Sequence, residues 1–332
     1  MTMRLSAIEP TPDAFAAVMA TGILSIAARN HQYARISETL DVLAVFAFSV
    51  LLAPVAAAAV RRRVAPWDLE DPDVTLRLFT FVAACAVLSS RVASHPMAAG
   101  ILGASALASW LWLGVLTVRN ISARPWPVLR DHVHGAWELA SVGTSGLVIM
   151  VMLLAEHSGR RWWLVAAVPL WVAAIGLYGL MTWLILWRAL AERQDRDGFE
   201  PDSWILMGAL AIVTLAGDYL HQLARGWLAG GIRAVTQVTW LAATLWIPLL
   251  VYFGLRRISR RPAVLQFAGV WWAMVFPLGM YSAATYAMSV ELGVRSLQTV
   301  SLVFFWDGLA LWLIVAAAGL QRLWCVAARS RT

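Results

Sequence analysis

The sequence alternates between long apolar segments and short polar connections over nearly its whole length. Ten of these segments can each cross a bilayer as a helix, because about 20 residues at a rise of 1.5 Å cover a hydrocarbon core of roughly 30 Å. They are residues 13–30, 37–60, 76–94, 97–118, 137–155, 161–187, 203–223, 232–254, 266–288 and 300–324. The pattern predicts an all-α integral membrane protein with ten transmembrane helices, in which residues 1–332 form a single channel or transporter domain.

The lengths of the connections indicate how these helices pair. Several are so short that each odd-numbered span and the even-numbered span after it should form an antiparallel hairpin. The odd spans carry small or hydroxyl residues near mid-membrane, whereas the even spans are bulkier, as in residues 110–113 and 183–187. Small residues allow close helix packing or line a polar path, and bulky residues suit lipid. We expect five helical hairpin repeats with the odd helices around a central pore, although close packing without a pore explains the same glycines.

The basic residues are distributed unequally between the two sides of this predicted domain. All 26 are arginine, and eighteen lie at the amino terminus, after even-numbered spans or in the carboxyl tail. The other side holds Arg29, Arg35, Arg91, Arg160, Arg161, Arg225, Arg233 and Arg295. Arginine-rich loops stay in the cytoplasm, so both termini should be cytoplasmic and the number of crossings even. We expect a multi-pass protein of the cell inner membrane.

The composition excludes several other classes of protein. With 61% hydrophobic residues, 14% charged residues and 19 Trp, the chain lacks the polar surface of a soluble domain. The net charge of +7 follows from the arginine bias, so anionic lipid headgroups explain it better than nucleic acid. We found no sequence motif of an enzyme and expect no cofactor. His132 and His134 superficially suggest a metal site, but with no further Cys/His cluster they indicate a solvated loop.

Three stretches resemble a known family. Residues 15–25 (FAAVMATGILS), 204–217 (WILMGALAIVTLAG) and 271–285 (WWAMVFPLGMYSAAT) are similar to the tellurite-resistance/dicarboxylate transporter family. That family includes the TehA-like bacterial channels and the slow-type anion channels of plant guard cells. The resemblance implies ten helices in five hairpins, a central pore inside the odd helices, a homotrimer, and an aromatic gate in the ninth helix.

Phe276 matches the position of that gate. If the ninth helix starts near Gln266, Phe276 lies ten residues inside it, which is about 15 Å and therefore the middle of the hydrocarbon core. Pro277 follows directly, and a proline inside a helix removes one backbone hydrogen bond and kinks the axis. The alternative is an ordinary core-facing or lipid-facing phenylalanine.

The remaining candidate residues line the path or its mouth. The expected pore-lining residues are Thr21, Gly22, Ser89, Ser90, Thr144, Thr214 and Gly279. Arg29, Arg91 and Asp218 all lie fifteen to seventeen residues into odd helices, so we expect a charged outer mouth that concentrates anions and includes His221. Alternatively, Arg91 and Asp218 form a structural ion pair and Arg29 reaches the lipid headgroups. Glu138 should cap the amino end of the fifth span.

These patterns predict a transmembrane channel for small inorganic or organic anions, gated by Phe276. A small-residue pore with weak dipolar contacts suits high flux, which needs weak binding. The alternative is a proton-coupled transporter or exporter of C4-dicarboxylate, sulfite or tellurite-related oxyanions. In that mechanism Asp218 and His221 would relay protons.

Overall fold

The computed structural model describes residues 11–60, 67–92, 95–191, 201–260 and 271–329, and the regular elements within these ranges are all helical. The long helices are α1 (Ala16–Asn30), α2 (Ala34–Val60), α4 (Phe79–Arg91), α5 (Pro96–Ser122), α7 (Leu139–Ser158), α8 (Leu164–Ala191), α9 (Ile205–Leu223), α10 (Gly226–Arg260), α11 (Trp272–Leu292) and α12 (Ser296–Arg329). Short helical segments precede or connect them: α3 (Pro72–Arg77), α6 (Trp126–His132), η2 (Gly135–Glu138), η3 (Arg161–Trp163) and η4 (Pro201–Trp204). The predicted all-α class is confirmed.

Eight helical stretches in the described residues are long and apolar enough to cross a membrane. Two of the ten predicted spans are not among them: α1 has only 15 residues, and α11, with 21, carries more polar side chains. The predicted start of the ninth span at Gln266 lies outside the described residues, and α11 begins at Trp272.

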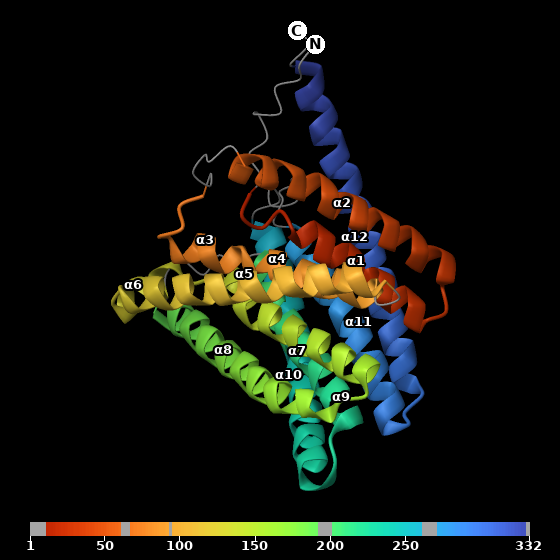
Figure 1. Cartoon of the computed structure of the whole chain (residues 1–332). Helices are drawn as coiled ribbons and strands as arrows, with labels where there is room; N and C mark the ends of the chain where they lie inside the picture. The colour runs from red at the N-terminus through yellow and green to blue at the C-terminus, as the bar shows by residue number, and fades with distance from the viewer. Residues whose placement is uncertain (1–10, 61–66, 93–94, 192–200, 261–270, 330–332) are drawn as a thin grey trace.

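Five of the helices form a closed ring. α1 contacts α4, α4 contacts α7, α7 contacts α9, α9 contacts α11, and α11 returns to α1. We call these the inner helices. Each packs against the long helix that follows it in the chain, namely α2, α5, α8, α10 or α12, which we call the outer helices. Figure 1 shows α2, α5, α8 and α12 along the periphery of the bundle.

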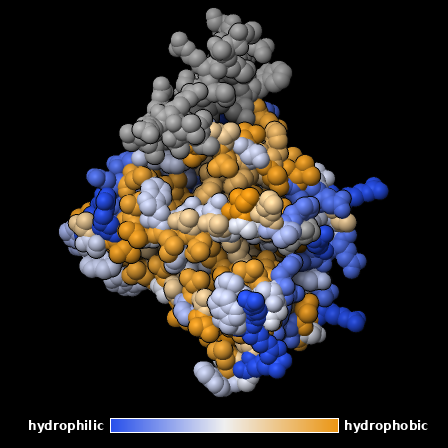
Figure 2. Space-filling view, in the orientation of Figure 1, coloured by the Kyte–Doolittle hydropathy of each residue, from blue (hydrophilic) through white to orange (hydrophobic). Residues whose placement is uncertain are grey.

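Burial separates the two sets of helices. The apolar windows that contain α4, α7 and α9 are 67–78% buried, whereas those of the five outer helices are only 17–22% buried. Figure 2 shows apolar residues across most of the visible face, with hydrophilic residues gathered toward its left and right edges and in its lower part. A broad apolar band between polar edges is the surface that a bilayer requires of an embedded bundle.

Hydroxyl groups join the two helices within each hairpin. The inner-helix hydroxyl bonds a backbone oxygen of the outer helix in four hairpins and a threonine hydroxyl in the fifth. The pairs are Ser25–Ser37 (2.9 Å), Ser89–Ala99 (3.3 Å), Ser141–Ala174 (2.9 Å), Ser282–Ser301 (2.7 Å) and Thr214–Thr239 (2.9 Å). Because lipid offers these groups no partner, such bonds satisfy them inside the protein.

A second set of bonds joins each outer helix to the inner helix of the next hairpin, and we call these the junction bonds. Four are donated by indole N–H groups: Trp110 to Thr144 (2.9 Å), Trp171 to the Val213 carbonyl (2.9 Å), Trp240 to Thr285 (3.1 Å) and Trp312 to Thr21 (2.8 Å). At the α2–α4 junction an ion pair of Asp41 and Arg91 takes this place. The junction bonds thus tie all five neighbouring pairs, from α12 back to α1.

Inner helices approach one another closely at glycines. A Cβ atom added to Gly208 in α9 would lie 2.9 Å from the Cβ and Cγ atoms of Pro277 in α11. Pro277 is rigid and buried, so its ring cannot make room for the added Cβ atom unless the two helices move apart. The α9–α11 contact therefore depends on the absence of a side chain at position 208.

We predict that Gly208→Ala lowers the free energy of unfolding by about 1–3 kcal/mol, the usual cost of overpacking. Thermal unfolding of the purified protein in detergent measures this. Gly176→Ala in α8 is the matched control, because an added Cβ there meets nothing within 4 Å and alanine is the better helix former. Equal melting temperatures for the two variants would contradict the prediction.

Candidate functional site

The ring of inner helices has a cavity at each end. The narrow cavity, of about 20 Å³, is lined by residues at the amino-terminal ends of the inner helices, such as Ala16, Thr80, Leu139, Ile205 and Ala273. The wide cavity, of about 890 Å³, is lined by residues toward the carboxyl-terminal ends of α1, α7, α9 and α11, with Arg233 of α10. The inner helices thus run parallel from the narrow mouth to the wide mouth.

One face of α11 lines both cavities. Ala273 lines the narrow cavity, and Ala283, Ala287 and Val290 line the wide one. These positions follow the spacing of three and four residues that keeps side chains on one face of a helix. Phe276 fits that spacing, three residues after Ala273, and it is fully buried. Its ring therefore lies on the lining face, between the two cavities.

Buried apolar side chains occupy the inner helices at positions between those that line the two cavities. Met19 and Ile23 of α1, Ile212 of α9, and Phe276 and Met280 of α11 are each no more than 2% exposed, and all belong to the hydrophobic core. On α9 the cavities are separated by the stretch from Ile205 to Leu215, ten residues or about 15 Å of helix. The two cavities share no lining residue.

The three predicted pore-lining threonines point toward the outer helices. Thr21 and Thr144 accept junction bonds from Trp312 and Trp110, and Thr214 bonds Thr239 of α10. Thr21 is also two residues from the lining position Met19, which places it about 200° away around the helix. We expected these hydroxyls to contact a passing anion. In the structure they instead bond neighbouring helices and hold the hairpins together.

The predicted small pore-lining residues also serve helix contacts. A Cβ atom on Gly22 would lie 2.5 Å from Cγ1 of Val87 in α4, and one on Gly279 would lie 3.0 Å from Cγ2 of Ile23 in α1. Ser89 bonds the Ala99 carbonyl of α5 at 3.3 Å. Ser90 bonds within its own helix, to the Val87 carbonyl at 2.6 Å. Close packing, the alternative stated from the sequence, accounts for these two glycines.

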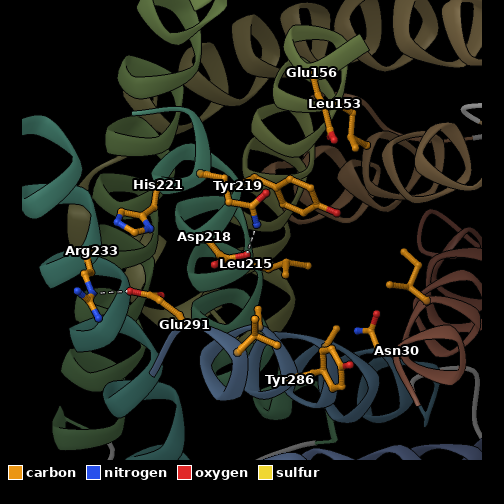
Figure 3. Close-up of a pocket in the computed structure, with 15 residues that line it drawn as sticks. Asn30, Leu153, Glu156, Leu215, Asp218, Tyr219, His221, Arg233, Tyr286 and Glu291 are labelled. Atoms are coloured by element: carbon orange, nitrogen blue, oxygen red, sulfur yellow. Dashed lines mark hydrogen bonds and ion pairs between the residues drawn. The ribbon is translucent and has the colours of Figure 1, made fainter. Parts of the chain in front are cut away.

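The wide cavity brings Asp218 and His221 together, as the sequence suggested. Glu156 and Glu291 line the same cavity, and Glu291 accepts a bond of 2.9 Å from the Arg233 guanidinium (Figure 3). Asp218 accepts a bond of 2.9 Å from the side-chain amide of Gln222. Three carboxylates against one arginine make this mouth acidic while the histidine is neutral, which is the opposite of the positive outer mouth that we expected.

Neither of the two arginines predicted for this mouth is among the residues that line the cavity, although Arg29 directly precedes the lining residue Asn30. Arg91 donates to both carboxylate oxygens of Asp41 and to the Ser37 hydroxyl, and its side chain is only 7% exposed. The predicted alternative partner, Asp218, is not its partner. Arg29 is exposed in the last turn of α1, where a cation favours the carboxyl end of a helix. Arg91 is therefore held in an ion pair between α4 and α2, whereas Arg29 is exposed beside the wide mouth.

Glu138 differs from its predicted capping role. It precedes α7, but its side chain makes no capping bond. One carboxyl oxygen accepts a bond of 2.8 Å from Thr182 in α8, and the whole residue is buried.

At the narrow mouth, sequence reasoning missed a network of charged residues. His134, which we had assigned to a solvated loop, lies between two carboxylates: Nδ1 is 2.6 Å from Asp202 and Nε2 is 2.5 Å from Asp73. Arg77 contacts Asp73 at 2.9 Å and Asp13 at 3.3 Å. Burial lowers the pKa of His134, but the hydrogen bonds and charges of Asp202 and Asp73 outweigh it and raise the pKa to about 9. The ring is therefore protonated at neutral pH.

Comparison with known proteins gives one family and several relatives. The sequence pattern of the voltage-dependent anion channel family matches residues 9–320. An uncharacterized transporter of Methanocaldococcus jannaschii is 22% identical over 324 residues, which cover 91% of this chain and 90% of that protein. An uncharacterized membrane protein of Mycobacterium tuberculosis (strain H37Rv) is 28% identical over 158 residues, which cover 46% of this chain and 80% of that protein.

The stability contributed by the Asp41–Arg91 ion pair between α2 and α4 can be tested by substitution. We predict that Asp41→Leu destabilises the protein by about 3–5 kcal/mol, because it leaves the buried Arg91 guanidinium without its counter-ion. Adding Arg91→Met should restore most of the loss, since an apolar pair of similar volume replaces a buried ion pair at little cost. Thermal unfolding in detergent measures both, and a double variant no more stable than Asp41→Leu would contradict this account.

Proposed function

This chain belongs to the voltage-dependent anion channel family, and from that premise we propose that it is a channel for small inorganic or organic anions, closed by Phe276. The match confirms the family resemblance found in the sequence motifs. The apolar helices and the membrane-protein relatives support a multi-pass protein that acts on anions in a membrane, without a catalytic role.

We further propose how the helices are arranged in the membrane. α1 and α11 would cross together with the eight longer apolar stretches, because both belong to the closed ring. This gives ten crossings, five hairpins and one domain. The arginine bias favours a narrow mouth in the cytoplasm, both termini on that side, and the inner membrane as location. Assembly as a homotrimer is expected from the family resemblance.

The single observation that carries the gate proposal is the position of Phe276. It is fully buried and lies between Ala273, which lines the narrow cavity, and Ala283, which lines the wide one, at a spacing that matches the same face of α11. Its neighbour Pro277 lacks the N–H group that would bond the preceding turn. A rotation of the ring at this kink would open space along the axis, whereas the bonded threonines would stay in place.

We predict that Phe276→Ala raises anion conductance in oocytes or vesicles at least about tenfold, because it removes the largest side chain between the cavities. Phe305→Ala is the matched control: Phe305 is equally buried but lies in the outer helix α12, stacked on Tyr33. Equal currents from the two variants at equal surface expression would refute the gate.

A second candidate function has one observation in its favour. The wide cavity holds Asp218, His221, Glu156 and Glu291 around one space, so protons could be exchanged there. This arrangement would suit a proton-coupled transporter of C4-dicarboxylate, sulfite or tellurite-related oxyanions.

Proteoliposomes separate the two functions. A channel gives anion flux set by voltage and concentration alone, whereas a coupled transporter moves protons with its substrate in a fixed ratio. We predict that Asp218→Asn leaves the anion flux within about twofold of the unsubstituted protein and that no substrate-driven pH change accompanies it. An internal pH change that disappears in Asp218→Asn would instead establish the transporter.

A further inference from the structure

The charged network at the narrow mouth surrounds a cavity to which all five inner helices present residues. Arg77, Asp13 and Asp202 line this cavity, and Asp73 and His134, which are not among its lining residues, bond Arg77 and Asp202 respectively. Its volume of about 20 Å³ is that of a single water molecule or small ion. An anion that follows the axis of the ring has to pass within reach of the Arg77 guanidinium.

The guanidinium is only partly occupied by its neighbours. Its Nε donates to Asp73 and its Nη1 to Asp13, but its Nη2 faces Nε2 of His134 at 3.3 Å. Both nitrogens of the histidine ring point at carboxylates, so both carry hydrogen. Two donors then face each other, and Nη2 has no acceptor among the described residues. Arg77 lines the cavity, and with the histidine ring protonated Nη2 keeps hydrogens that it can donate to a bound anion.

A second polar group at the cavity has no partner. Oδ1 of Asp202 is buried and accepts no hydrogen bond within the described part of the chain, while Oδ2 is held by His134. The cavity has room for one of two occupants: an anion at Arg77, or a water molecule that donates to Oδ1 of Asp202.

The balance of charge depends on His134. Asp13, Asp73 and Asp202 give three negative charges, against Arg77 and the protonated histidine. The five helix amino ends add positive potential, roughly half a unit charge each before solvent screening. The side chains alone therefore carry one net negative charge while His134 is protonated, so binding of an anion depends on the helix amino ends, and the site loses about one further positive unit when the ring becomes neutral.

We propose that Arg77 is an anion-binding residue at the narrow mouth, specific for small monovalent anions, and that His134 is the positioning residue that offsets Asp73 and Asp202. The inference deepens the proposed function, because it names a binding station on the same path. It differs from the gate, which excludes ions by size.

Binding is tested first, because it requires no current. Purified protein in detergent is heated in nitrate or chloride, with gluconate as the bulky anion at equal ionic strength. Nitrate and chloride should raise the melting temperature relative to gluconate by stabilising the folded state. Arg77→Gln should abolish this difference, Arg77→Lys should retain part of it, and Arg119→Gln, at an exposed arginine near the end of α5, should keep all of it.

Conduction and pH provide the second test. In the Phe276→Ala background, the half-saturating chloride concentration should rise about fivefold or more with Arg77→Gln, since a charge-assisted contact is lost. With His134 intact, the half-saturating chloride concentration should also rise as the pH increases from 7.5 to 10, because the His134 ring loses its charge above about 9. His134→Gln should have the raised half-saturating chloride concentration at both pH values. This variant provides the test if Arg77→Gln does not fold.

The outcomes separate this inference from the proposed function. A Phe276→Ala protein without current, but with nitrate protection that Arg77→Gln removes, would overturn the channel and keep the site. Current with unchanged half-saturation in both Arg77→Gln and His134→Gln would overturn the site and keep the channel. Equal protection by nitrate and gluconate would also overturn the site.

Discussion

The ring of inner helices depends on polar bonds between hairpins. In a bilayer, apolar side chains gain little by leaving lipid for one another, so helices associate through close packing and through hydrogen bonds. Here four indole N–H groups and one ion pair hold each outer helix to the next inner helix. Glycines such as Gly208 bring the inner helices close enough for these bonds to form. The four tryptophans and the Asp41–Arg91 pair are structural, and their bonds hold one face of each inner helix toward the preceding outer helix.

The parallel course of the inner helices makes the two mouths different. Amino ends with their positive partial charge meet at the narrow mouth, and carboxyl ends surround the acidic wide cavity. Arg77 and His134 add positive charge to the narrow mouth, whereas Asp218 and Glu156 add negative charge to the wide cavity. An anion would therefore find a favourable potential at one end of the path and an opposing one at the other, with the apolar level of Phe276 between them.

Hydropathy and arginine counts predicted the helical class, the membrane and most spans, because both follow directly from the cost of polar groups in lipid. They did not predict which way a side chain points. Thr21 and Thr144 have the composition of pore-lining residues, yet hydrogen bonds turn them outward, and those bonds come from tryptophans 291 and 34 residues away in the chain. The narrow-mouth network was missed for the same reason, since His134 meets Asp73 and Asp202 across 61 and 68 residues. One signal was present: acidic residues precede or begin several odd spans at a similar depth.

The bond between Trp312 and Thr21 closes the ring between the last long helix and the first. During synthesis the first four hairpins enter the membrane before residue 312 has left the ribosome. Until then the ring is incomplete, and both its first and its last hairpin lack a neighbour on one side. Only the arrival of α12 supplies the donor for the waiting hydroxyl of α1. Ring closure is therefore a late event in biogenesis, and a nascent chain that stalls short of α12 has two free flanks with which the hairpins of a neighbouring chain can pair.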